Sequence, residues 1–201
     1  MNNYFSREQP KIYFQLSSSL RRQVEEVYNH AKKYKPAVLQ NESHPYLHEK
    51  DLREFCRLYG IAFQAYSALG SADRPWRKSG SITSGAPKVG HEVLQNPEIL
   101  KIAAKYGKSA ANVVLRWHLQ MGGCCVAKSV TPSRIEENYR LFDFTLSAID
   151  MAQMDELNVG WRHLMWAETS MHPDYPFKDD LPYGYVLGKP DASSTAGKMT
   201  D

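Results

Sequence analysis

The sequence predicts an α/β fold built on a parallel β-sheet. Short apolar runs alternate along the chain with longer segments whose apolar residues recur every three or four positions. The short runs have the length of buried strands and the longer segments have the period of amphipathic helices, so their alternation favours parallel strands joined by helices. With 201 residues, the chain is long enough for one good core, or for two small domains at most.

The first helix is predicted to begin near Leu20 and to end before Pro36, whose ring cannot continue it. Val24 lies on its apolar face. The short apolar run that follows predicts a strand near residues 37–40. Residues 1–16 show no clear period and are left unassigned.

A second helix follows, in which Leu52, Phe55 and Tyr59 share one face and Gly60 marks the end. Residues 61–66 then predict a second strand, because the run is short and rich in apolar and aromatic side chains.

Two helices come next, each with a clear start signal. Asn96 is a suitable N-cap, and Pro97 suits the first turn. Gly107 ends this helix, Ser109 caps the next one, and Gly122 ends it in turn.

The third strand is predicted at residues 124–127, and Thr131-Pro132 opens the helix after it. Three apolar residues of this helix are expected to face the core: Ile135, Tyr139 and Phe142. Ser147 begins a capping-box pattern before a last short helix.

Composition excludes several classes of protein. Hydrophobic residues make up 42% and charged residues 23% of the chain, as in soluble globular proteins, and the net charge of +3 is too small for a nucleic-acid footprint. No apolar run reaches the roughly 18 residues of a membrane helix, and no signal peptide is recognisable. Three cysteines, two of them adjacent, make a poor disulfide framework and favour a reducing, cytoplasmic setting.

A sheet of three parallel strands with helices on one face would leave its edges open. We therefore expect an apolar opposite face, a larger α/β architecture around this chain, and self-association through the open sheet when the chain is alone.

The stretch from 126 to 134 contains the clearest candidate for ligand chemistry. A strand ends in Lys128 and Ser129, and a helix then starts at Thr131 with Arg134 in its first turn. Free amides at a helix N-terminus favour phosphate, and ligands of parallel sheets bind at the carboxyl ends of strands. The alternative is an ordinary capped helix with a solvated Lys and Arg, and spacing alone leaves both open.

Other polar or aromatic segments have two interpretations each. Residues 65–71 leave a strand and run into a long loop, which suits either a pyrophosphate contact or a plain turn, and locally the turn is favoured. His44 follows a strand as a candidate base, although His-Pro turns are more often structural. The C-terminal aromatics would line an apolar pocket or pack under the fold: Trp161, Trp166, Tyr175, Phe177, Tyr183 and Tyr185. No Cys/His spacing suggests a metal site.

Several long motifs in sequence order resemble one family. They are Lys-Pro-Ala-Val-Leu-Gln at 35–40, Glu-Ser-His-Pro-Tyr-Leu at 42–47, Ala-Tyr-Ser-Ala-Leu-Gly-Ser at 65–71, Asp-Arg-Pro-Trp at 73–76, Lys-Ser-Val-Thr-Pro-Ser-Arg-Ile-Glu-Glu-Asn at 128–138, Phe-Asp-Phe at 142–144 and His-Pro-Asp-Tyr-Pro-Phe at 172–177. From about Ser17 to Tyr183 the chain resembles the C-terminal half of the aldo-keto reductases, closest to the NADP-dependent aldehyde reductases.

The resemblance implies a partial TIM (β/α)8 barrel that consists of the last three strands and their helices. Residues 17–158 would form this partial barrel. Residues 159–190 would form a tail like the family's substrate loop, and residues 191–201 a disordered end.

The resemblance also implies a cofactor site for NADP, weak or incomplete here. Tyr66 would stack on the nicotinamide and Gln40 would bond its carboxamide, while Asn138 would lie on the adenine. The pyrophosphate would lie along Ser67, Leu69 and Ser71. The 2′-phosphate end would be held by Lys128, Ser129, Val130, Thr131 and Arg134. Trp76 would border the pocket for a small carbonyl substrate.

The departures from the family bear on activity. The family's catalytic Asp, Tyr, Lys and His motifs are not found, so no catalytic residue is assigned. Ser17-Ser18 stands for a Ser-Asn, Ala127 for a Pro and Glu137 for a Gln. The resemblance implies NADPH-dependent reduction of aldehydes, but we expect the isolated chain to be inactive. The alternative is a non-catalytic remnant that binds cofactor or a partner, or a gene fragment.

Overall fold

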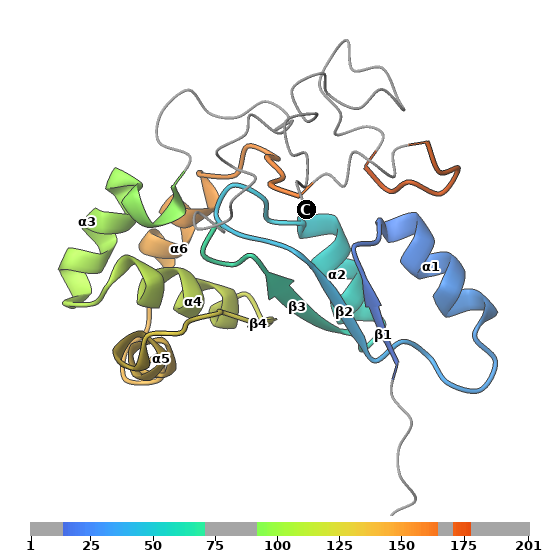
Figure 1. Cartoon of the computed structure of the whole chain (residues 1–201), viewed down its shortest axis with the longest axis horizontal. Helices are drawn as coiled ribbons and strands as arrows, with labels where there is room; N and C mark the ends of the chain where they lie inside the picture. Colours follow the sequence, from blue (N-terminus) through green and yellow to red (C-terminus); the bar gives the residue numbers. More distant parts are fainter. Residues whose placement is uncertain (1–13, 71–91, 165–170, 178–201) are drawn as a thin grey trace, which may run out of the picture.

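The computed structural model describes residues 14–70, 92–164 and 171–177. Its centre is a parallel sheet of four strands in the order β1-β2-β3-β4. The strands are β1 (Gln15–Ser17), β2 (Val38–Glu42), β3 (Ala62–Tyr66) and β4 (Cys124–Cys125). The three predicted strands are confirmed as parallel neighbours (Figure 1).

The fourth strand, β1, was not predicted. It begins within the unassigned segment 1–16 and pairs with β2 through Gln15 opposite Val38. Three residues are too few to show a strand period, so β1 is defined by its pairing with β2 rather than by its own sequence. The expected disordered end at 191–201 lies outside the described residues.

The helices agree with the predicted start and stop signals. Their bounds are α1 (Arg21–His30), α2 (Lys50–Leu58), the short 3₁₀ helix η2 (Val93–Gln95), α3 (Pro97–Tyr106), α4 (Ala110–Gln120), α5 (Pro132–Tyr139) and α6 (Ala148–Asp155). Asn96 accepts the amides of Glu98 and Ile99, and Ser109 and Ser147 cap α4 and α6. Within the described part of the chain, no helix has the length and apolarity to cross a membrane.

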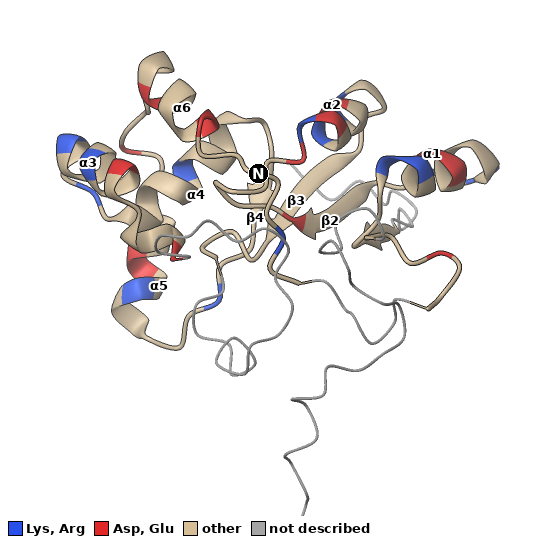
Figure 2. Cartoon of the chain, turned by 90° about the horizontal axis from the view of Figure 1, so that it is seen from above, with Lys and Arg blue, Asp and Glu red and all other residues tan. Residues whose placement is uncertain are grey.

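The core lies between the sheet and the helices on one of its faces. Leu39, Phe63 and Ala65 point from the strands into this layer, where Phe55 of α2 and Leu115 of α4 cover them. A second cluster joins α3, α4 and α6. Figure 2 shows α1, α2, α4 and α6 on one side of the sheet, with acidic and basic residues mixed along them. This mixing agrees with the small net charge and forms no basic stripe.

The opposite face of the sheet is polar, so the expectation of an apolar face is wrong. Strand register places Ser17, Gln40, Gln64 and Cys124 in one row across all four strands. The Gln40 side-chain amide donates to the Gln64 side-chain oxygen. Side chains alternate between the two faces of a strand, and here the residues between the buried ones are mainly polar. Water can therefore solvate this face.

Helix α5 also departs from its prediction. None of its residues is buried, and the three apolar side chains expected to face the core are exposed: Ile135 at 53%, Tyr139 at 78% and Phe142 at 72%. Phe142 lies beyond the end of the helix, and the least exposed positions of α5 are the polar Glu137 and Asn138. The apolar side chains stay exposed, because no described element packs on that side of β4, the last strand of the sheet.

Candidate cofactor-binding cleft

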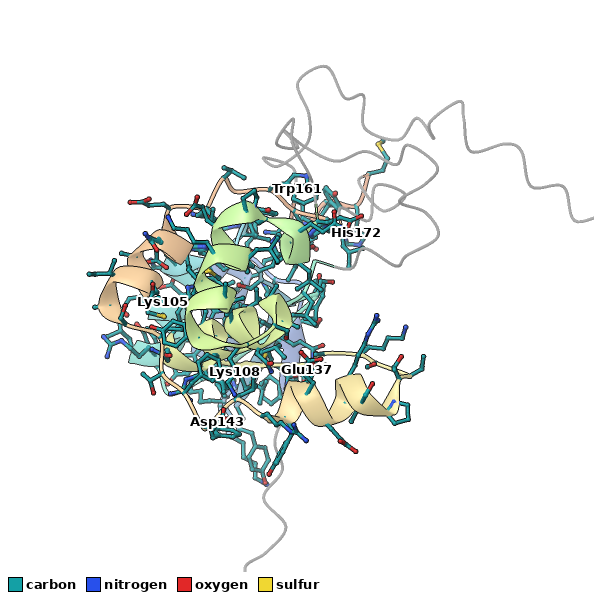
Figure 3. The ribbon with its side chains drawn as sticks, turned by 90° about the vertical axis from the view of Figure 1, so that its left-hand side faces the viewer. Lys105, Lys108, Glu137, Asp143, Trp161 and His172 are labelled. Carbon is teal, nitrogen blue, oxygen red and sulfur yellow. The ribbon has the colours of Figure 1, made fainter. Side chains whose placement is uncertain are left out.

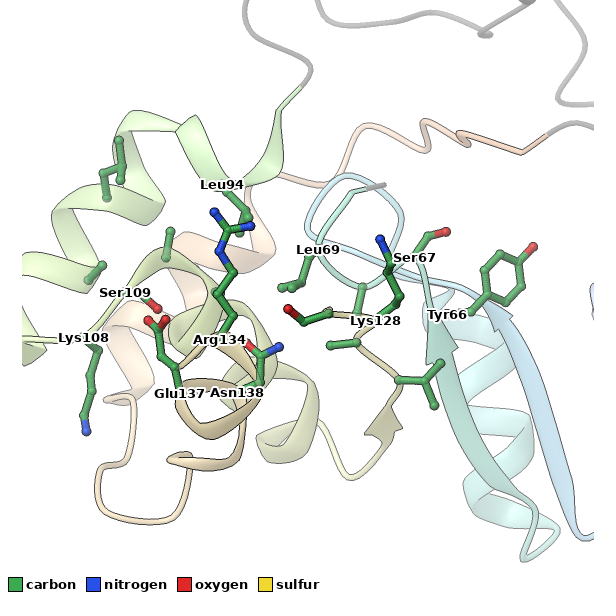
Figure 4. Close-up of a pocket in the computed structure, with 18 of the residues that line it drawn as sticks. Tyr66, Ser67, Leu69, Leu94, Lys108, Ser109, Lys128, Arg134, Glu137 and Asn138 are labelled. Atoms are coloured by element: carbon green, nitrogen blue, oxygen red, sulfur yellow. The ribbon is translucent and has the colours of Figure 1, made fainter. Parts of the chain in front are cut away.

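A cleft of about 1320 Å³ lies at the carboxyl ends of β3 and β4 (Figure 4). Six segments line it: residues 66–69 after β3, Leu94 of η2, parts of α3, residues 108–111 at the start of α4, residues 126–129 after β4, and α5. Ligands of parallel sheets bind at the carboxyl ends of the strands, because the connecting loops leave the sheet there and expose backbone groups.

The cleft brings together seven of the eleven residues predicted to contact a cofactor. They are Tyr66, Ser67, Leu69, Lys128, Ser129, Arg134 and Asn138. Gln40, Val130 and Thr131 are not among its lining residues. Ser71 and Trp76 lie outside the described residues.

A tight turn after β3 shapes one wall of the cleft. Ser67 has a positive φ of 53°, and its carbonyl accepts the amide of Gly70 at 2.8 Å. Gly70 itself has a φ of 85°, and a Cβ on it would lie 2.7 Å from Val93 Cγ2. Only glycine fits both the conformation and the close approach to η2.

The strand pairing carries the Lys128 segment to the cleft. The Val126 amide donates to the Ala65 carbonyl at 2.9 Å, so the chain continues beside β3 beyond Cys125. The Ser129 hydroxyl then accepts the amide of Thr131 at 3.2 Å, which positions the start of α5. Pro132 occupies the first turn of α5, where its lack of an amide proton removes no hydrogen bond of the helix.

The charge of the cleft comes from a few side chains. Lys108 lines the cleft and is paired with Asp143, its Nζ 2.6 Å from Oδ2 (Figure 3). Arg134 is exposed and makes no ion pair with any described residue, so its guanidinium is available to a ligand. Glu137 lines the same cleft and opposes the positive charge of Lys128 and Arg134.

One wall of the cleft was missed by sequence reasoning. It is apolar and comes from η2, α3 and α4: Leu94, Leu100, Ala103, Ala104, Ala110 and Ala111. Short side chains at the junction of two helices leave room for a flat ring. The paired alanines were visible in the sequence, but their meeting depends on the packing of α3 against α4.

Two predicted nicotinamide contacts are engaged with neighbouring residues. The Tyr66 hydroxyl lies 3.3 Å from the Ser18 hydroxyl, and the Gln40 amide bonds Gln64. Gln40 lies on the polar face of the sheet, one strand away from the cleft. The structure therefore assembles the Lys128 end of the predicted site more completely than the Gln40 end.

His44 belongs to a buried cluster at the carboxyl end of β2. Its Nδ1 accepts the Tyr46 amide at 3.3 Å, so its Nε2 carries the proton that bonds Glu42 Oε1 at 3.0 Å. Glu42 also accepts the amides of His163 and Leu164. Glu42, His44 and His163 are close enough together to ligate a metal ion. Here, however, the carboxylate and the His44 Nε2 proton serve hydrogen bonds that hold the segment after α6, which fits the structural interpretation of His44.

Three of the C-terminal aromatics pack in the interior. Trp161, Tyr175 and Phe177 are at most 5% exposed, and none of them lines the cleft. Arg162 joins this packing, with its guanidinium 4.2 Å from the Phe177 ring centroid and 2.6 Å from Glu49 Oε1. Trp166, Tyr183 and Tyr185 lie outside the described residues.

Comparison with known proteins bears directly on the resemblance. The model of the Aldo/keto reductase family matches residues 12–159. This chain belongs to that family. The described part of this aldo/keto reductase chain is a partial barrel-like α/β fold with four parallel strands.

The relatives extend well beyond the matched region. Aldo-keto reductase family 1 member A1 of Pongo abelii is 41% identical over 173 residues, which cover 82% of this chain and 50% of the relative. The Homo sapiens protein of the same name is 40% identical over the same lengths. The solved aldose reductase of Schistosoma japonicum superposes with a TM-score of 0.68 at 32% identity, covering 84% of this chain and 48% of that one. The chain thus spans about half the length of the curated relatives it matches.

Proposed function

We propose that this chain binds NADP(H) in the cleft, with the 2′-phosphate end at Lys128, Ser129 and Arg134. The observation that supports the proposal is that two distant segments meet in one cleft. The residues predicted after β3 and those predicted after β4 are about sixty positions apart in sequence, and both groups line the cleft at the start of α5. Both segments leave the carboxyl ends of parallel strands, where ligands bind.

The residues present fit an adenine nucleotide that carries an extra phosphate. Lys128 supplies a point charge, and Arg134 supplies a planar guanidinium that pairs with phosphate or stacks on adenine. The first amides of α5 add partial positive charge. The alanine-rich wall of α3 and α4 offers an apolar surface to the base.

We further propose that β2, β3 and β4 correspond to the last three strands of the family's barrel, and β1 to the strand before them. Bound NADPH would supply hydride for reduction of a small carbonyl compound, as in the family. The family's proton-donor motifs are not found in the sequence, so we expect no turnover by this chain alone. General acid catalysis contributes typically about 10²–10⁴-fold, and its loss leaves little rate.

Calorimetric titration tests the binding proposal. We expect 2′,5′-ADP and NADP to bind with similar affinity and NAD to bind more weakly. Lys128→Ala with Arg134→Ala removes two hydrogen bonds to a charged group, each worth about 1.5–3 kcal/mol, and should weaken NADP binding by at least about 100-fold.

The matched control removes the same charge elsewhere, with Arg22→Ala and Lys32→Ala on exposed sites. It should leave binding unchanged. Equal affinity for NAD and NADP, or no loss in the cleft variant, contradicts the proposal. An assay of aldehyde-dependent NADPH oxidation, run beside a sample without protein, tests the expected lack of turnover.

A non-catalytic partner-binding chain is the second candidate function. The observation that favours it is that the apolar side chains of Ile135 and Tyr139 on α5 are exposed. Neither residue lines the cofactor cleft.

A further inference from the structure

Among the residues that the structure describes, neither end strand of the sheet has a partner on its outer side. In the described chain, β1 pairs only with β2 and β4 pairs only with β3. The amides of Ser18 and Val126 point into the sheet, to Gln40 and Ala65. Because backbone groups of a strand alternate in direction, those of Ser17 and Cys125 point away from the sheet at its two ends.

The open side of β4 has an apolar groove beside it. The groove has a volume of about 700 Å³ and lies between β4, the middle of α4 and α5. Its apolar lining residues are Leu115, Cys125, Ala127, Ile135, Tyr139 and Leu141. Its polar lining residues are Glu136 and three residues that it shares with the cofactor cleft: Lys128, Ser129 and Asn138. Ile135 and Tyr139 are one helical turn apart on α5, and both are more than half exposed. An exposed stripe of this kind beside an open strand edge marks an interaction surface.

We propose that a second copy of this chain occupies that surface, with its β1 edge added in parallel to β4. A two-fold axis along the strand direction keeps all strands parallel, and it brings β4 of each copy to β1 of the other. Both open edges are thereby used at once, so the assembly closes as a dimer. Figure 1 shows β1 and β4 at opposite ends of the sheet, as this closure requires.

The strand count favours a second copy over other occupants. Parallel β/α units close into a barrel at eight strands, and two copies of this sheet supply four each. The helix α1 of the second copy, which exposes Val27, would then neighbour the stripe on α5.

The polar face of the sheet, opposite the helices, also favours a second copy as the partner. Gln40 and Gln64 already bond each other across strands, and a second copy would bring an identical amide pair to the opposite wall. Amides carry both donors and acceptors, so two such faces can satisfy each other. A purely apolar peptide or a lipid surface would leave these groups unpaired.

Light scattering coupled to size exclusion, on the full chain over a range of concentrations, tests the proposal. We expect a mass twice the 22.9 kDa of one chain. Ile135→Lys with Tyr139→Lys should reduce it to one chain, with an unchanged circular dichroism spectrum because both side chains are exposed. Leu58→Lys with Ile149→Lys, exposed apolar residues elsewhere, should remain a dimer.

A second variant tests closure itself. Ser17→Pro removes an outward amide of β1 and leaves the bond from Ser18 to Gln40 in place. In a closed dimer both edges are needed, so this variant should also be a monomer. A wild-type monomer, an open series of larger species, a dimeric α5 variant, or a dimer that survives Ser17→Pro each overturns the proposal.

Discussion

Lys105 of α3 and Asp150 of α6 form an ion pair in which the lysine Nζ lies 3.0 and 2.8 Å from the two carboxylate oxygens. The Tyr106 and Ser147 hydroxyls bond the same carboxylate, which is almost fully buried. Burial opposes ionisation, but the bonds from Lys105, Ser147 and Tyr106 together outweigh it and hold the pKa of Asp150 well below its usual range. The pair joins two helices behind the cleft.

Asp150→Asn should lower the free energy of unfolding by about 2–3 kcal/mol. The amide cannot accept three donors as well as the carboxylate does, and it leaves buried donors unsatisfied. Urea unfolding measures the loss. Lys105→Ala should cost under about 1 kcal/mol, since that lysine is half exposed and water can replace it. Equal losses in the two variants contradict this account.

Stability should fall as the pH drops below about 6.5, and His48 is one cause. Burial, aided by Lys50 and Arg53 and opposed by Asp155, lowers the pKa of His48 to about 4. Between these two pKa values, His48 therefore binds a proton in the unfolded chain but not in the folded chain. The contribution of neutral His48 is complete above the ordinary value of about 6.5 and is lost as the pH falls toward 4. His48→Gln should flatten unfolding free energy against pH between 7 and 5, and an unchanged slope contradicts the assignment.

Gly70→Ala should destabilise the chain by about 2–3 kcal/mol and loosen the cleft wall. Its Cβ would need a left-handed backbone and would overlap Val93. Gly60→Ala is the matched control, because Gly60 has a similar φ of 68° but no neighbour within 4 Å. The control should cost only about 1 kcal/mol of backbone strain. Thermal melts of the two variants separate steric overlap from conformation, and identical melts would refute the overlap.

Glu137→Gln should strengthen binding of 2′,5′-ADP severalfold at low salt. The change removes a negative charge from the cleft that holds Lys128 and Arg134. Salt screens such charges over about 10 Å at 0.1 M, so the gain should shrink as salt is added. Glu136→Gln, on the same helix but outside this cleft, is the control. A salt-independent gain, or an equal gain in the control, argues against electrostatics.

The sequence predicted what local chemistry determines. Asn96 and Ser147 cap their helices with their own side chains, so α3 and α6 were predictable from a few adjacent residues. The strand-end position of Lys128 likewise follows from an apolar run and a Thr-Pro start. These signals lie within one turn or one strand, and tertiary packing did not alter them.

The remainder depends on distant partners. β1 is a strand because Gln15 pairs with Val38, and no pattern in the sequence near Gln15 predicts this pairing. The stripe on α5 was visible through Ile135, but periodicity does not say whether a neighbour covers it. Leu100 reaches the cleft only through the packing of α3 on α4. The predicted contact at Gln40 faces the polar side of the sheet, which depends on strand register.

The buried Glu42 carboxylate sets an order for the folding of the chain. The sheet strands are neighbours in sequence order, so β1 to β3 can pair while later residues are still being synthesised. Glu42, however, receives the amides of His163 and Leu164, which follow it by 121 and 122 residues. Until that segment arrives, the carboxylate needs water and its end of β2 stays hydrated. Closure of long loops delays such contacts, so the region around Glu42 is expected to be the last part of the core to exclude water.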